Sequence, residues 1–239
     1  MIRNICCLCD TKGVNGLDLC QFCHKSLPHN HFCCHQCAAP LSASDTNRNR
    51  LICGRCLATS NRIDHSIVPY LYRPPVDFMI KRLKFSEQLK YSRLLGDLLA
   101  DAIEHYYADD SIDTPAQCCS TFPDVILPMP THRERLLQRG FNQAQEIAHI
   151  VANRFNRHCD TTLVSRSVSR QPQSSLSAAQ REANIRRTFE ITNPAAINGL
   201  HVAVVDDVYT TGATARAITR KLKSAGTTKV SIWAVARTP

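Results

Sequence analysis

The stretch "VAVVDDVYTTGATA", residues Val202–Ala215, decides the fold and raises the question of function. An apolar run leads into two adjacent carboxylates, Asp206 and Asp207, and a segment of threonine and glycine follows. A continuous apolar run of this length predicts a strand that is buried on both faces. Two like charges beside a buried strand are costly, so they require a ligand or a strained turn.

Strands and helices are predicted to alternate around this stretch. Short strands are expected within 63–72, and further strands over 124–129, 161–167, 201–207 and 229–237. A pair of helices is expected over 74–107, and single helices over 142–157 and 211–226, the last closed by Gly226. Apolar strands that alternate with helices predict an α/β fold with a mainly parallel sheet covered on both faces.

Length and charge limit the domain count and the class of partner. A chain of 239 residues has room for one domain of catalytic size and a small module, which we expect at 61–239 and 1–60. The formal net charge of +9 favours a polyanionic partner, such as nucleic acid, a phosphorylated metabolite or an anionic membrane surface. The start "MIRNICCLCD" lacks the apolar region of a signal peptide, and no apolar run is long enough to span a membrane. A cytoplasmic location is therefore expected.

Cysteines are concentrated in the first segment, since ten of the 13 lie within residues 1–56. Eight of them form four Cys-x-x-Cys pairs, and two such pairs complete one tetrahedral zinc site. Sequential pairing requires less loop closure than interleaved pairing and is preferred. One or two structural zinc ions are therefore expected. The predicted ligands are Cys6, Cys9, Cys20 and Cys23 for the first site, and Cys34, Cys37, Cys53 and Cys56 for the second.

Other interpretations of the cysteine segment stay open. A disulfide framework or a redox pair fits poorly with a reducing cytoplasm and with the repeated spacing. Histidines lie nearby and could replace a cysteine at one site: His24, His29, His31 and His35. Cys7 and Cys33 lack a partner three residues on and are expected to be spare, and Cys118, Cys119 and Cys159 are expected to be small apolar fillers.

The segment after the acidic pair has the composition of a phosphate cradle. Backbone amides and hydroxyls gather where a helix is expected to begin, at Thr210, Thr211, Gly212, Ala213 and Thr214. Carboxylates beside a phosphate site are useful if they accept hydrogen bonds from sugar hydroxyls or face a cation. A ribose 5-phosphate satisfies both halves of the motif. The alternative is a simple strand-turn-helix with a solvated acidic corner. A corner occluded by packed side chains, or carboxylates engaged in salt links within the chain, would overturn the prediction of ligand binding.

With its two aspartates and Thr-Thr-Gly-x-Thr, the stretch resembles the PRPP-binding motif of type I phosphoribosyltransferases. Together with the cysteine pairs and "PMPTHRERLLQRGFNQA" at 128–144, nearly the whole chain resembles the ComF family, competence-associated proteins with an amidophosphoribosyltransferase-like domain. The resemblance implies a type I phosphoribosyltransferase fold preceded by a cysteine-rich zinc module. It also implies Arg133, Arg135 and Arg139 at the pyrophosphate, and magnesium bound with PRPP near Asp206 and Asp207. Asp206, Asp207 and Arg139 are then the catalytic candidates.

The same resemblance implies a mobile lid within 165–191. Its candidate residues are Arg166, Arg170, Gln173, Gln180, Arg181, Asn184 and Arg187. Another basic cluster, Lys81, Arg82 and Lys84, is at least as consistent with a solvated helix face.

Two classes of function follow from the resemblance. The first is a PRPP-binding protein of natural competence that handles or imports single-stranded DNA, in the cytoplasm or at the inner face of the membrane beside the DNA-uptake machinery. The second is an active phosphoribosyltransferase with an unidentified nitrogenous acceptor. Thr210 stands where hypoxanthine/guanine-type enzymes carry aspartate, which disfavours a 6-oxopurine acceptor. The sequence leaves turnover and oligomeric state open.

Overall fold

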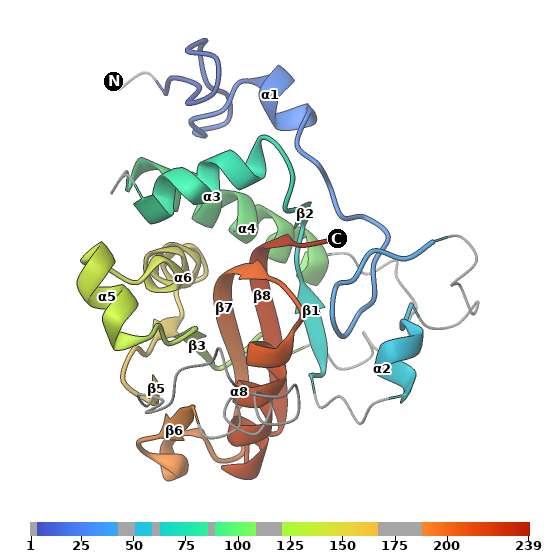
Figure 1. Cartoon of the computed structure of the whole chain (residues 1–239), viewed down its shortest axis with the longest axis vertical. Helices are drawn as coiled ribbons and strands as arrows, with labels where there is room; N and C mark the ends of the chain where they lie inside the picture. The colour runs from blue at the N-terminus through green and yellow to red at the C-terminus, as the bar shows by residue number, and fades with distance from the viewer. Residues whose placement is uncertain (1–3, 43–50, 59–62, 86–88, 109–120, 167–187) are drawn as a thin grey trace, which may run out of the picture.

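The computed structural model describes residues 4–42, 51–58, 63–85, 89–108, 121–166 and 188–239 (Figure 1). Its strands are β1 (His65–Ile67), β2 (Tyr70–Leu71), β3 (Val125–Pro128), β4 (His158–Cys159), β5 (Val164–Arg166), β6 (Phe189–Ile191), β7 (His201–Tyr209) and β8 (Lys229–Arg237). Its helices are α1 (Gln21–Lys25), α2 (Gly54–Ala58), α3 (Val76–Phe85), α4 (Lys90–Ala108), α5 (Arg133–Arg139), α6 (Gln143–Arg154), α8 (Ala213–Ser224) and the 3-10 helix η3 (Pro194–Ile197).

A parallel sheet forms the centre of the molecule. Its strand order is β1-β8-β7-β3-β4, with β2 also paired to β8, and every pair in it is parallel. The central strand β7 is the apolar run of the deciding stretch. It extends two residues beyond the predicted end at Asp207, because Val208 and Tyr209 still pair with β8. The predicted parallel α/β fold is therefore confirmed.

Helices cover both faces of this sheet, which explains the continuous apolar composition of β7. Ala203 and Val205 pack on the face that α3, α4 and α6 cover. Val202 and Val204 point to the other face, which α8 covers (Figure 1). Successive side chains of a strand alternate between faces, so a strand covered on both sides is apolar at every position.

One predicted strand forms, but it does not belong to the main sheet. Residues 161–167 were expected in the main sheet, but β5 pairs antiparallel with β6 in a separate two-stranded sheet. The strand next to β3, at this edge of the main sheet, is instead the short strand β4. Asp160 Oδ1 accepts hydrogen bonds from the backbone N–H groups of Thr162 and Leu163, at 2.7 and 3.0 Å, and this turn directs the chain out of the sheet.

The cysteine-rich segment contributes to both cores. Leu17 and Leu19 belong to the hydrophobic cluster that contains α3 and α4. Cys34 and Ala38 belong to the cluster on the opposite face of the sheet. In Figure 1 the segment therefore runs from beyond α3 to the edge of the sheet beside β1. The predicted domain boundary at residue 60 falls outside the described residues and stays a prediction.

A buried polar cluster lies at the amino ends of the central strands. Ser231 Oγ is 2.6 Å from His201 Nε2 and 3.2 Å from His65 Nδ1, and Tyr107 Oη is 3.3 Å from His65 Nε2. Burial lowers the pKa of both histidines, that of His65 to about 3. Folding therefore favours the neutral form of both imidazoles.

This cluster predicts acid sensitivity. An unfolded histidine has a pKa of about 6.5, so below that pH the unfolded chain binds protons that the folded chain excludes. The stabilisation is present above this pH, and it is lost as the pH falls from about 6.5 toward the folded pKa of His65, about 3. Urea unfolding of the wild type and of the double variant His65→Asn/His201→Asn should show a flatter pH dependence in the variant. Metal release also depends on pH, so the two chains are compared at equal zinc content. Identical slopes would contradict the assignment.

Candidate functional site

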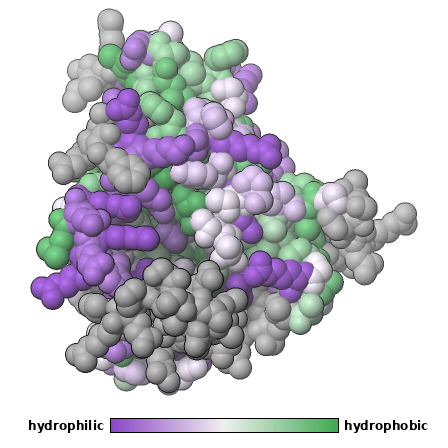
Figure 2. All heavy atoms as spheres, in the orientation of Figure 1, coloured by the Kyte–Doolittle hydropathy of each residue, from purple (hydrophilic) through white to green (hydrophobic). Residues whose placement is uncertain are grey.

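A cavity of about 330 Å³ opens at the carboxyl ends of β3 and β7, where open α/β sheets bind ligands. Strongly hydrophilic side chains gather on this face of the molecule, between α3 and α5 (Figure 2). The charged side chains that line the cavity are Lys84, Arg135, Arg139, Arg166, Asp206 and Asp207. Four cations against two carboxylates make the cavity complementary to an anionic ligand.

Asp207 is held by an ion pair within the chain. Its Oδ2 lies 2.7 Å from Nζ of Lys84, which reaches the cavity from α3, and both side chains are largely buried. Of the two interpretations left open for this basic cluster, the solvated face therefore does not apply to Lys84. The contact also counts against the prediction that both carboxylates are free to accept from a sugar, because Asp207 already has a cationic partner.

Asp206 is the acid that stays available. Its Oδ1 accepts the backbone N–H of Asp207 at 2.9 Å, and the described residues place no ion pair on it. Burial and the neighbouring Asp207 raise the pKa of the Asp206 carboxyl. Asp206 therefore keeps its proton to a higher pH than an ordinary carboxyl, and it can exchange hydrogen bonds with a hydroxyl in the cavity.

The ion pair predicts that Lys84→Met destabilises the fold. The change leaves Asp207 buried beside Asp206 without its cation, which we expect to lower the free energy of unfolding by about 3 kcal/mol. Lys81→Met on the same helix is the matched control, because the Lys81 side chain is exposed, and a much smaller change in the free energy of unfolding is expected. Urea unfolding of both variants at pH 7 makes the comparison. Equal effects of the two substitutions would show that Lys84 and Asp207 are not strongly coupled.

The predicted phosphate cradle lies only partly on the cavity. Thr210 and Thr214 line it, whereas Thr211, Gly212 and Ala213 are not among its lining residues. Gly212 precedes α8 with a φ of 74°, in the left-handed region that favours glycine. A Cβ at this position would lie 3.0 Å from Tyr209 Oη and 2.9 Å from Arg216 Nη1, so any side chain would displace both.

Two of the three predicted pyrophosphate arginines line the cavity. Arg135 and Arg139 reach it from α5, whereas Arg133 is not among the lining residues. The helix α5 was not predicted as a helix, because none of its residues is buried and no apolar periodicity marks it. The loop that carries α5 is closed at its base, where Asn142 Nδ2 donates to the backbone oxygen of Met129 at 3.1 Å.

Gln143 is a site residue that the sequence did not predict. It is 3% exposed and lines the cavity. Its Oε1 accepts from Arg139 Nη1 at 3.0 Å, and its Nε2 has no hydrogen-bond partner among the described residues. An unsatisfied buried amide is costly and points to a ligand acceptor in the cavity. The only sequence signal is its position beside Asn142, which caps the start of α6.

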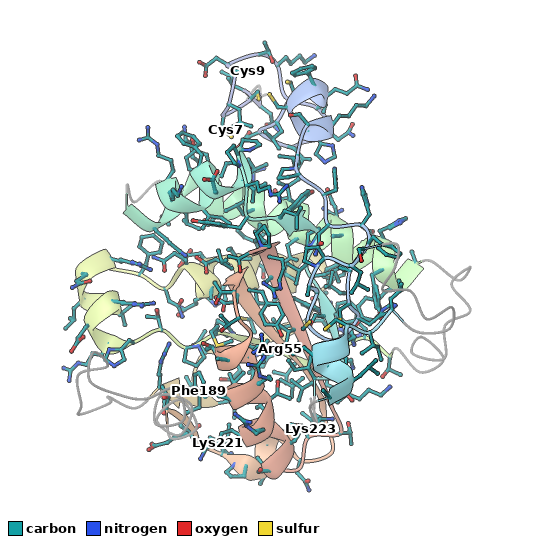
Figure 3. All side chains as sticks on the ribbon, turned by 45° about the vertical axis from the view of Figure 1, so that its right-hand side comes forward. Cys7, Cys9, Arg55, Phe189, Lys221 and Lys223 are labelled. Atoms are coloured by element: carbon teal, nitrogen blue, oxygen red, sulfur yellow. The ribbon has the colours of Figure 1, made fainter. Side chains whose placement is uncertain are left out.

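Arg166 is the lid candidate that the structure describes. It lies on β5, with its guanidinium 5.6 Å from the ring centre of Phe189, and lines the cavity. In Figure 3 Phe189 lies close to α8. Burial and the nearby Arg135 guanidinium lower the pKa of Arg166. Its Nε has no partner among the described residues. The other lid candidates, Arg170, Gln173, Gln180, Arg181, Asn184 and Arg187, lie outside the described residues.

The cysteines form the two groups that sequential pairing predicted. In each group the four sulfur atoms lie within 4.8 Å of one another, and no histidine in the described residues joins them. We define Cys6, Cys9, Cys20 and Cys23 as the first group, and Cys34, Cys37, Cys53 and Cys56 as the second group. Four thiolates at this separation fit a closed tetrahedral site for structural zinc.

Cys7 and Cys33 lie outside both groups, as predicted. Burial raises the pKa of each thiol to about 11, so neither is a thiolate at neutral pH. Figure 3 shows Cys7 and Cys9 together at the end of the molecule beyond α3.

Comparison with known proteins shows which protein family and which relatives this chain resembles. Residues 137–239 match the phosphoribosyl transferase domain family. The chain is 28% identical to DNA utilization protein YhgH of Escherichia coli O157:H7, over 99% of this chain and 98% of the relative. It is 28% identical to competence protein F of Haemophilus influenzae, over 93% of this chain and 91% of the relative. It is 26% identical to competence protein ComFC of Bacillus subtilis, over 95% of this chain and 94% of the relative.

These relatives confirm the predicted resemblance to competence-associated proteins with a phosphoribosyltransferase-type domain, since they align over nearly the full chain. In the part of the chain that the structure describes, no helix has the length and apolar character needed to cross a membrane.

Proposed function

We propose that this protein binds PRPP in the cavity at the carboxyl ends of β3 and β7, and that it acts in the cytoplasm on single-stranded DNA taken up during competence. The observation that carries the proposal is the composition of the cavity. Its lining includes the available acid Asp206 with Thr210 and Thr214, and the three cations Arg135, Arg139 and Arg166. A phosphorylated ribose with a pyrophosphate group has hydroxyls for the acid and dense negative charge for the arginines.

Each part of PRPP has a chemical counterpart in the cavity. The 5-phosphate is expected at the threonines where α8 begins, because a helix start favours an anion. The ribose hydroxyls are expected at Asp206, and the pyrophosphate at the three arginines, whose guanidinium groups match phosphate oxygens. The unsatisfied amide of Gln143 adds a donor at the pyrophosphate end.

Magnesium is proposed to bind together with PRPP. Asp207 is already paired with Lys84, and the pKa of Asp206 is raised, so the chain offers few free ligands for a divalent ion. The residues that remain near the sugar end are Asp206 and Thr210. They fit an ion held mainly by the oxygens of the ligand, which is the usual arrangement for Mg²⁺ at phosphates and would add charge neutralisation there.

The second candidate function is transfer of the ribose 5-phosphate to an acceptor nitrogen. The bond between C1 of the ribose and the pyrophosphate oxygen breaks, and the pyrophosphate leaves with the electron pair. The acceptor nitrogen forms the new bond to C1 and loses its proton to solvent. Arg135, Arg139 and Arg166 favour this step, because they stabilise the leaving pyrophosphate. No protein nucleophile is needed.

Several observations support single-stranded DNA as the partner. The relatives include proteins named for DNA utilization and for competence. The formal net charge of +9, or roughly +5 with a zinc ion on four thiolates in each cysteine group, favours a phosphate backbone. Phe22 on α1 is 81% exposed, and such aromatic rings stack with bases in proteins that bind single strands. A position at the inner face of the membrane, beside the DNA-uptake machinery, is part of the same proposal.

Two measurements test the proposed function. Calorimetric titration of the full chain with PRPP and magnesium should give saturable binding to one site. Affinity for single-stranded DNA should fall steeply between about 50 and 200 mM salt. Absence of PRPP binding would overturn the ligand assignment, and affinity that is independent of salt would overturn the electrostatic DNA contact. Pyrophosphate release from PRPP over a panel of bases and nucleotides decides between the two candidate functions.

A further inference from the structure

Arg237, the last residue of β8, contacts both the second cysteine group and Tyr209, the residue before the loop Thr210–Thr214. Its Nε donates to the backbone oxygen of Cys37 at 3.1 Å, and its Nη1 donates to the backbone oxygen of Tyr209 at 3.2 Å. Its guanidinium also lies 5.3 Å from the ring centre of Tyr209. One side chain therefore connects a residue of the second group to the residue that precedes Thr210.

Tyr209 carries this contact into the loop Thr210–Thr214. It is 3% exposed, and β7 ends at this residue. Its hydroxyl lies directly under Gly212, since a Cβ added at Gly212 would be 3.0 Å from Tyr209 Oη. The ring position thus determines where the left-handed turn at Gly212 can lie, and the turn determines where Thr210 and Thr214 face the cavity.

We propose that Arg237 is a positioning residue that couples metal occupancy of the second cysteine group to ligand affinity at the loop Thr210–Thr214. This inference rests on the proposed function, because it requires a phosphorylated ribose at the loop.

The coupling has a physical cause in the geometry of the second group. A metal ion held by the four sulfur atoms of this group would fix the turn that contains Cys37, and so the backbone oxygen that accepts from Arg237 Nε. The loaded and empty states therefore hold Arg237, and with it Tyr209, differently.

Coupling between two sites is reciprocal, so ligand must change metal binding by the same factor that metal changes ligand binding. The zinc-loaded full chain is exposed to a chromophoric chelator, with and without saturating ribose 5-phosphate, and zinc release is measured at equilibrium over a series of chelator concentrations. Ribose 5-phosphate is expected to strengthen retention of one of the two ions by about fivefold or more. Inorganic pyrophosphate, which is expected at the arginines and not at the loop, should have a smaller effect.

Variants separate positioning from simple destabilisation. Arg237→Met keeps the length of the side chain and removes the donors and the charge, so ribose 5-phosphate should no longer alter zinc retention. Ser66→Ala is the matched control. Its hydroxyl donates to the backbone oxygen of Gln36 at 2.8 Å, in the same cysteine turn but away from the loop. This control should weaken the turn and leave the effect of ribose 5-phosphate on zinc intact.

The outcomes distinguish this inference from the proposed function. If ribose 5-phosphate and PRPP do not bind the wild type in calorimetry, the proposed function is wrong and the coupling falls with it. If they bind and zinc retention is unchanged, the coupling alone is overturned. If Arg237→Met does not retain zinc, the change in zinc retention that ribose 5-phosphate causes in the wild type tests the coupling. Arg237→Lys keeps the charge but cannot make both contacts, so ribose 5-phosphate should change its zinc retention less than that of the wild type.

Discussion

Exchanging both acids of the cavity for amides, Asp206→Asn with Asp207→Asn, is expected to lower the affinity for PRPP by about 100-fold or more. Asp206 is the acid available to the ribose hydroxyls, and a buried polar group left without its hydrogen-bond partner costs roughly 1–3 kcal/mol. The fold should persist because the amides are close in size to the acids they replace, but its stability should fall because Asp207→Asn removes the ion pair with Lys84. Calorimetric titration measures the loss, and far-ultraviolet circular dichroism checks the fold.

The single variants refine this prediction. Asp206→Asn should account for most of the loss, since Asp207 is already paired with Lys84. Asp77→Asn is the matched control, because Asp77 is an acid on α3 that pairs with Lys81 outside the cavity. Its affinity for PRPP should equal that of the wild type. Full affinity in the double variant would mean that the sugar does not bind at this corner.

Replacing one cysteine of the second group, with Cys34→Ser, is expected to reduce the bound zinc from two ions per chain to one and to destabilise the fold strongly. Zinc binding contributes about 10–16 kcal/mol in small zinc-binding peptides, which is comparable to the whole stability of an ordinary domain. Cys34 is fully buried in the core on the α8 face, so the loss extends beyond the cysteine turn. Elemental analysis gives the zinc content, and thermal unfolding gives the stability.

The neighbouring cysteine provides the control for this experiment. Cys33→Ser should keep two zinc ions, because Cys33 lies outside both groups. Its side chain is of the same size and lies one residue away, so general disturbance of the turn affects both variants. Two ions in Cys34→Ser, or one ion in Cys33→Ser, would contradict the assigned ligands.

The sheet could be predicted from sequence because its strands are marked by burial on both faces. Residues 201–207 and 229–237 are apolar runs, and both are central strands. The strands β4 and β6 are only two or three residues long, and no pattern marks them. The strand β5 lies within the predicted 161–167, but its pairing with β6 outside the main sheet was not predicted. The turn at Asp160, which directs the chain out of the main sheet, depends on a local side-chain contact that periodicity does not record.

The residues of the candidate site could be predicted where they are contiguous in one motif. They could not be predicted where segments distant in the sequence meet. Asp206, Asp207 and the threonine loop are contiguous, so their composition is enough to indicate a phosphorylated sugar. Lys84 comes from a helix more than a hundred residues away, and its spacing is that of a solvated face. Arg237 is likewise placed by a tertiary contact, with the backbone oxygen of Cys37. The two cysteine groups were predictable because ligand spacing is itself local.

A crystal structure of the full chain with PRPP and magnesium tests the central claim most directly. We predict the 5-phosphate at Thr210 and Thr214, a ribose hydroxyl within hydrogen-bond distance of Asp206, and the pyrophosphate between Arg135, Arg139 and Arg166. PRPP bound elsewhere on the molecule, or a cavity that stays closed to it at saturating concentration, would contradict the account.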